Sequence, residues 1–194
     1  MTYMGDTRAG VRRFGQLAAL VAVLIITLAL VVQTSCSGDE SSQKSDKSNR
    51  TSDSEGNAPN FKLKSLDGKA VELKSLKGKI VVIDFWATWC PPCRITLPLM
   101  NNIYKKTRGK DVEVFGISTD RVSSQKVREF AKKMNLSMPI LHDRNGTVSR
   151  KYGIRGIPAM FIIDQQGNIH DRHVGADRSL DKKVLEEIAK LLKE

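Results

Sequence analysis

Cysteine is scarce in this sequence, which has three among its 194 residues. A small secreted scaffold held together by disulfides would carry more cysteines, in an even number. Structural zinc is also disfavoured, because such a site takes four Cys or His ligands, and the sequence has one C-x-x-C and three unpaired histidines. The cysteines divide into a close pair, Cys90 and Cys93, and a distant Cys36, which need separate explanations.

Long runs of Lys or Arg are absent too, although the net charge is +11. Without such a run, no nucleic-acid partner is predicted. The positive excess favours acidic partners or anionic lipid head groups, and it fits a solvated face equally well.

Residues 37–57 contain no aliphatic or aromatic residue. A stretch of this composition buries too little apolar surface to offset the entropy of ordering it. We predict a disordered tether with an r.m.s. reach of about 25 Å.

Residues 17–32 form an apolar run interrupted only by Thr27, and Arg8, Arg12 and Arg13 precede it. A basic segment followed by an apolar one is typical of a secretory signal. At ~1.5 Å per residue the run spans about 24 Å, a length between that of a cleaved signal and an uncleaved anchor. We predict a chain attached to the cell membrane through its N-terminus, with the remainder on the extracytoplasmic side.

Cys36 follows this run, with the small residues Thr34 and Ser35 before it, as in a bacterial lipoprotein signal. Gln33 departs from that pattern, which has a Leu-like residue three positions before the cysteine. Lipidation of Cys36 and a plain thiol beside an uncleaved anchor both stay open.

One folded domain is predicted over residues 58–194, after the signal or anchor (1–36) and the tether (37–57). Alternating apolar residues predict a hairpin over 61–73, and a continuous apolar run over 79–86 predicts a central strand buried on both faces. Apolar spacing predicts further strands and helices. The helices are expected over 92–106, 123–134 and 180–192, and the strands over 112–118, 159–163 and 169–174. This order implies an α/β sandwich with a mixed sheet.

The pair in Cys90-Pro91-Pro92-Cys93 has the spacing of a disulfide-exchange centre. At the start of a helix, the macrodipole and free N–H groups favour a thiolate. Cys90 is therefore predicted to be an exposed nucleophile and Cys93 the thiol that resolves the mixed disulfide. The two prolines remove N–H donors, which destabilises the thiolate relative to the disulfide and predicts a centre that leans toward reduction.

Asp84 lies in the predicted central strand, six residues before Cys90. Burial there raises the pKa of a carboxyl group, so Asp84 is predicted to exchange a proton with Cys93. Ile157-Pro158 precedes another apolar strand, where proline commonly occurs; spacing alone does not indicate a cis bond.

The segment from Ile83 to Arg94, together with Pro98 and Arg155-Gly-Ile-Pro-Ala159, resembles the thioredoxin superfamily. The two prolines, the anchor and the hairpin resemble its TlpA/ResA-like branch. The resemblance implies a thioredoxin fold with an inserted helical segment near 122–138. It also implies a cis Pro158 beside Cys90, Trp86 and Trp89 packed around the site, and substrate contacts at Trp89, Pro91, Ile157 and Pro158.

The resemblance implies a monomeric, cofactor-free oxidoreductase that reduces exported protein disulfides, apocytochrome c among them, with a membrane electron donor. Thr96 departs from the Glu that members acting on apocytochrome c often carry, which weakens that assignment. The alternatives are a thiol peroxidase and a non-catalytic lipoprotein adaptor. Ala87 stands where peroxiredoxins have threonine, and the intact Cys90, Cys93 and Pro158 argue against an adaptor.

Overall fold

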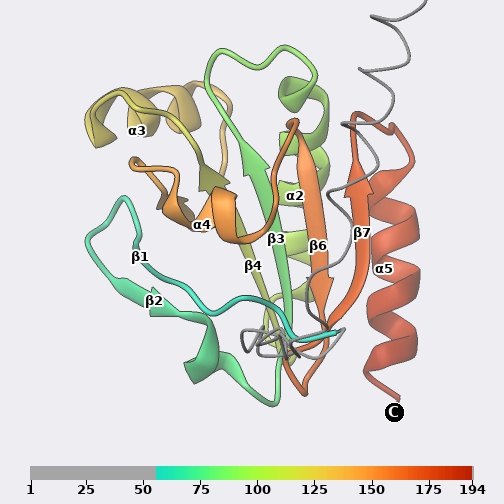
Figure 1. Cartoon of the computed structure of the whole chain (residues 1–194). Helices are drawn as coiled ribbons and strands as arrows, with labels where there is room; N and C mark the ends of the chain where they lie inside the picture. The colour runs from blue at the N-terminus through green and yellow to red at the C-terminus, as the bar shows by residue number, and fades with distance from the viewer. Residues whose placement is uncertain (1–55, 194) are drawn as a thin grey trace, which may run out of the picture. The chain divides into compact units, whose positions relative to one another are not determined.

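A computed structural model describes residues 56–193, which form a mixed sheet with helices on both faces (Figure 1). The predicted anchor, Cys36 and most of the predicted tether lie outside this range. Within the range, no helix has the length and apolar character needed to cross a bilayer. The elements in chain order are β1 (Lys62–Lys64), β2 (Ala70–Glu72), η1 (Leu73–Leu76), β3 (Ile80–Trp86), α2 (Cys93–Thr107), β4 (Val112–Ser118), α3 (Ser124–Lys133), β5 (Ile140–His142), α4 (Thr147–Lys151), β6 (Ala159–Ile163), β7 (Ile169–Val174) and α5 (Leu180–Leu191).

The main sheet has the strand order β5-β4-β3-β6-β7. Strand β3 pairs parallel with β4 and antiparallel with β6, so the predicted mixed sheet is confirmed. The hairpin β1–β2 forms a separate two-stranded sheet. Strand β5 and helix α4 were not predicted, because elements of three and five residues are too short for a periodic pattern.

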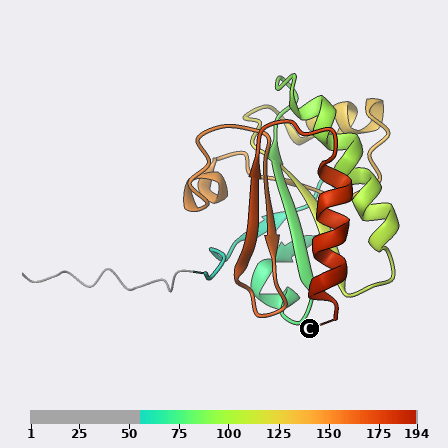
Figure 2. The same ribbon diagram turned by 90° about the vertical axis from the view of Figure 1, so that its right-hand side faces the viewer.

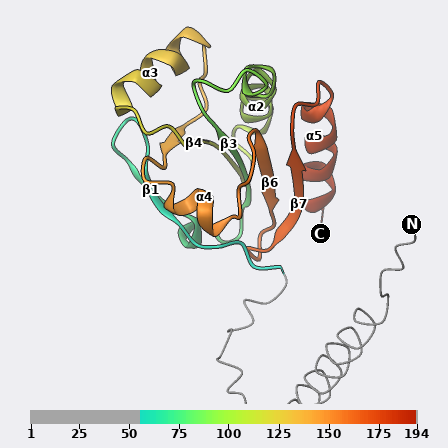
Figure 3. The same ribbon diagram turned by 45° about the horizontal axis from the view of Figure 1, so that its top comes forward.

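Strand β3 is buried along its whole length and separates two apolar cores. Ile80, Val82 and Trp86 contribute to the core that includes residues of α2, α3 and α5. The alternate residues of β3 contribute to the second core, which contains Phe61 near the hairpin and Tyr152 after α4. Figures 2 and 3 show α2 and α5 on one side of the sheet and α4 on the other.

Gly116 in β4 lies opposite Asp84 and leaves room for the Trp86 ring. A Cβ at Gly116 would lie 2.9 Å from Trp86 Nε1 and 2.9 Å from Ile140 Cδ1, closer than such atoms approach. The absence of a side chain at Gly116 therefore leaves space for the buried Trp86 ring.

The first described residues, 56–58, lie beside the β6–β7 turn. Asn57 forms an isolated β-bridge with Asn168, and the Ala58 N–H donates to the Gly167 carbonyl over 2.9 Å. Gly56 and Asn57, which lie in the predicted tether, therefore pair with the start of β7 and the turn before it.

Candidate redox site

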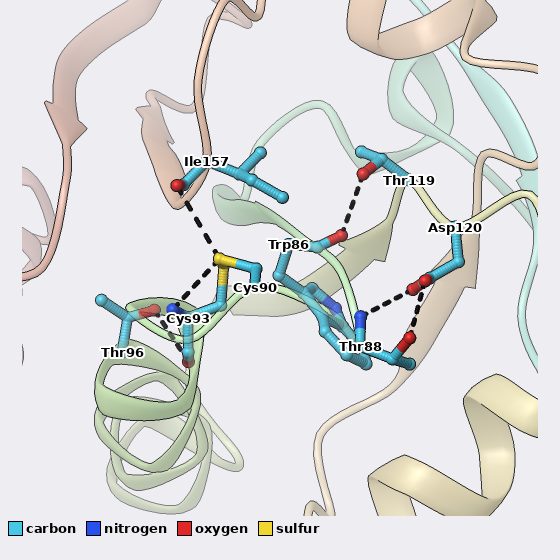
Figure 4. The surroundings of a disulfide bond; sticks show 8 residues. All are labelled: Trp86, Thr88, Cys90, Cys93, Thr96, Thr119, Asp120 and Ile157. Carbon is cyan, nitrogen blue, oxygen red and sulfur yellow. Dashed lines mark hydrogen bonds between the residues drawn. A yellow bond between two sulfur atoms is a disulfide. The ribbon is translucent and has the colours of Figure 1, made fainter.

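Cys90 and Cys93 form a disulfide where the chain passes from β3 into α2, with their Cα atoms 5.4 Å apart (Figure 4). Helix α2 begins at Cys93, one residue later than predicted. Pro91 and Pro92 form the preceding turn, where their carbonyls accept from the N–H groups of Arg94 and Ile95. The prolines supply these acceptors without adding N–H donors beside the sulfur atoms.

The Cys90 sulfur has two polar neighbours. The Cys93 N–H donates to it over 3.2 Å, and the Ile157 carbonyl oxygen lies 3.8 Å away. The Ile157–Pro158 bond is cis, which confirms the expectation from the resemblance. Cys90 is only 2% exposed, so the prediction of an exposed sulfur is wrong for the disulfide state. The disulfide bond to Cys93 and the neighbouring Ile157 account for the low exposure of Cys90.

Asp84 lies in the core beneath α2. It lies on the same face of β3 as Val82 and Trp86, both of which belong to the core on the α2 side. Asp84 is fully buried, and among the described residues neither carboxyl oxygen has a hydrogen-bond partner of ordinary geometry. Desolvation raises the pKa of Asp84 to about 7, an effect partly opposed by the Thr96 hydroxyl. The group is therefore suited to exchange a proton near neutral pH.

Asp120 was missed by the sequence reasoning, yet it fixes the segment that leads to Cys90. Its buried carboxylate accepts from the Thr88 backbone N–H (2.9 Å), the Thr88 hydroxyl (2.8 Å) and the Ser118 hydroxyl (2.9 Å). The parallel register pairs Trp86 with Ser118, so two residues further along Thr88 lies beside Asp120. The sequence signal for this role was the cluster of polar residues at the carboxyl end of the strand predicted over 112–118.

We expect Asp120→Ala to lower the free energy of unfolding by about 1–3 kcal/mol, because the Thr88 N–H loses its acceptor in a part-buried position. Thr88→Val is the matched control, since it removes one hydroxyl and keeps the backbone bond. Urea denaturation of both oxidised variants measures the difference. A loss for Thr88→Val as large as that for Asp120→Ala would contradict the assigned role of the carboxylate.

The four predicted substrate-contact residues differ in exposure. Trp89 is 67% exposed and Pro91 is exposed, whereas Ile157 is half-buried and Pro158 is buried. Trp86 is fully buried and stacks against Phe130 at a centroid distance of 5.5 Å. Trp89 and Pro91 therefore offer surface to a partner, while Trp86 supports the site from below.

Comparison of the sequence with known proteins identifies the family to which the chain belongs. A sequence profile described as the AhpC/TSA family matches residues 55–172. The chain belongs to this family. The thiol-disulfide oxidoreductase ResA of Bacillus thuringiensis subsp. konkukian (strain 97-27) is 39% identical over 112 residues, which are 58% of this chain and 64% of that relative. The alignment thus spans slightly less than two thirds of ResA.

Solved structures of similar sequence share the fold. A Chlorobium tepidum protein assigned as the thiol:disulfide interchange protein DsbE is 31% identical, with a TM-score of 0.66 over 72% of this chain and 98% of that one. The pneumococcal exposed lipoprotein thioredoxin Etrx1 from Streptococcus pneumoniae strain TIGR4 is 29% identical, with a TM-score of 0.61 over 69% of this chain and 100% of that one. The predicted thioredoxin fold is therefore confirmed.

Proposed function

We propose that this chain is a membrane-tethered thiol–disulfide oxidoreductase that reduces disulfides of exported proteins on the extracytoplasmic side. The observation that carries the proposal is the Cys90–Cys93 disulfide at the first turn of α2, beside the cis Ile157–Pro158 bond. The ResA relative is itself named a thiol-disulfide oxidoreductase, and Etrx1 is named a lipoprotein. The apolar run over 17–32 and Cys36 support the tether.

The reaction begins with reduced Cys90. Its thiolate attacks one sulfur of the substrate disulfide, which forms a mixed disulfide and releases one substrate thiolate. The Cys93 thiol then passes its proton to the Asp84 carboxylate and attacks the Cys90 sulfur. This second step releases the other substrate thiolate and leaves the Cys90–Cys93 disulfide seen in the structure. A dithiol donor at the membrane restores the reduced pair.

Few N–H hydrogen-bond donors lie near the Cys90 sulfur, and this favours electron flow from the reduced protein to its substrate. We expect a reduction potential well below the value of about −120 mV that strong periplasmic oxidants have. Pro92→Ala restores one N–H near the sulfur and should raise the potential, on the order of 30 mV. Pro98→Ala, at an exposed position inside α2, should leave it unchanged. Redox titration against glutathione measures all three proteins, and a wild-type value near −120 mV would contradict the reductive direction.

The groups near Cys93 bear on which protein is the substrate. Thr96 is fully buried, and its hydroxyl donates to the Cys93 carbonyl over 3.2 Å. It supplies no carboxylate, so Asp84 is the buried acid beside this turn. Apocytochrome c is one candidate client, and other exported proteins with a disulfide are equally suited to the site.

A trapping experiment tests the proposed function. Without a resolving thiol, Cys93→Ala should hold its substrate as a mixed disulfide on Cys90. Mass spectrometry of the non-reduced adducts from intact cells identifies the bound protein. The Cys90→Ala/Cys93→Ala variant is the control and should yield no adduct. Adducts of equal abundance on both variants, or no enriched exported protein, would contradict a dedicated reductase.

A further inference from the structure

A cavity of about 690 Å³ is lined by residues of η1, the start of β3 and the β6–β7 turn. Its lining includes Leu73, Leu76, Val81 and Ile163, which give it apolar walls. Strand β3 begins beside this cavity, is seven residues long and ends at Trp86, before the redox motif. A strand of that length spans about 20 Å, so the cavity is separate from the redox site.

Four lysines also line the cavity: Lys74, Lys77, Lys79 and Lys151. Lys79 is paired with Glu113 at 2.6 Å. Within residues 56–193, the other three have no ion pair with a carboxylate, although Lys151 donates to the Asn60 carbonyl. The acidic residue in the lining is Asp164, whose two oxygens accept from Asn168. The cavity rim therefore carries an excess of positive charge.

The described chain enters the domain at this same cavity. Asn57, Ala58 and Pro59 belong to its lining, and Ala58 is hydrogen-bonded to Gly167 in the β6–β7 turn. In Figure 1 this turn and η1 lie at the lower end of the domain, whereas β3 points toward the upper end. A tether from the membrane would thus join the domain beside its lysine-lined cavity.

We propose that this cavity, defined by Lys74, Lys77 and Lys151, docks on anionic lipid head groups. The proposal rests on the membrane tether of the proposed function. Apolar walls with a cationic rim match the boundary between acyl chains and phosphate groups, and lysines near an anionic surface are attracted to it. Docking at this end leaves the Cys90–Cys93 disulfide facing away from the membrane, where exported proteins reach it.

The test uses the full chain in vesicles of phosphatidylcholine, with or without phosphatidylglycerol. An amine-acylating reagent that does not cross membranes labels exposed lysines, and mass spectrometry measures the rate at each position. Lys74, Lys77 and Lys151 should be acylated roughly fivefold more slowly in the anionic vesicles, as expected for direct contact with the surface. Lys132 and Lys133, exposed on α3, should react equally in both.

The charge-reversal variant Lys74→Glu/Lys77→Glu should abolish the protection of Lys151. Lys132→Glu/Lys133→Glu is its matched control and should keep that protection. Equal labelling of Lys74 and Lys77 in both vesicle types overturns the proposal in favour of a solvated face. Protection by inorganic phosphate in neutral vesicles overturns the lipid assignment in favour of a small-anion site.

Flotation of the same samples separates this proposal from the proposed function. A chain that floats with both vesicle types but shows equal labelling overturns only the docking of the cavity. A chain that floats with neither overturns the tether and, with it, the docking.

Discussion

Cys90→Ala is expected to reduce the rate of insulin disulfide reduction by on the order of 100-fold or more, to the rate of the thiol donor alone. The variant lacks the thiolate that attacks the substrate, and Cys93 does not replace it. Both sulfur atoms are buried in the disulfide state, but Cys93 lies within the first turn of α2, whereas Cys90 precedes the helix and lies beside Ile157. The assay follows insulin precipitation with wild type and variant at equal concentration.

Cys36→Ala is the matched control for this loss. It removes the one cysteine outside the redox motif, so the full chain in detergent should keep wild-type activity. Equal rates for Cys90→Ala and wild type would remove the enzyme interpretation and favour an adaptor that uses the fold only for binding. Loss of activity in Cys36→Ala would show that the third cysteine takes part in the exchange.

Asp84→Asn is expected to remove most of the pH dependence of stability between pH 4 and 8. In the folded protein the pKa of Asp84 is about 7, above the value of about 3.9 for an unfolded aspartate. Between these values the folded state binds more protons than the unfolded state, so the free energy of unfolding falls as pH rises. The loss is nearly complete by about pH 8 and is on the order of 4 kcal/mol.

The measurement is urea denaturation of the oxidised protein at pH 5 and pH 8, where wild type should be less stable at the higher pH. The comparison uses the pH slope, because the buried amide that replaces the carboxyl group in Asp84→Asn carries its own desolvation cost at every pH. Asp67→Asn, in the exposed hairpin turn, should retain the wild-type slope. An unchanged slope in Asp84→Asn would contradict the raised pKa and the proton transfer from Cys93.

The local pattern of apolar residues was sufficient to predict the longer strands and helices. The continuous apolar run of β3 was predicted as a strand covered on both faces, and the alternation of Ile80 to Trp86 between the two cores explains why. Strand β5 and helix α4 depend on contacts instead. Asp143 accepts from the N–H groups of Val148 and Ser149 at the start of α4, and Val148 packs into the second core.

The sequence by itself determined the candidate redox motif, because the spacing of Cys90 and Cys93 after a buried strand is a local property of the chain. The same holds for Asp84, whose apolar neighbours predicted its burial. Only the tertiary structure joined Asp120 to Thr88, brought the Ile157 carbonyl to the Cys90 sulfur, and gathered Lys74, Lys77 and Lys151 around one cavity. These contacts join residues 32 or more positions apart in the first two cases, and they exist because strand register and sheet order bring distant segments together.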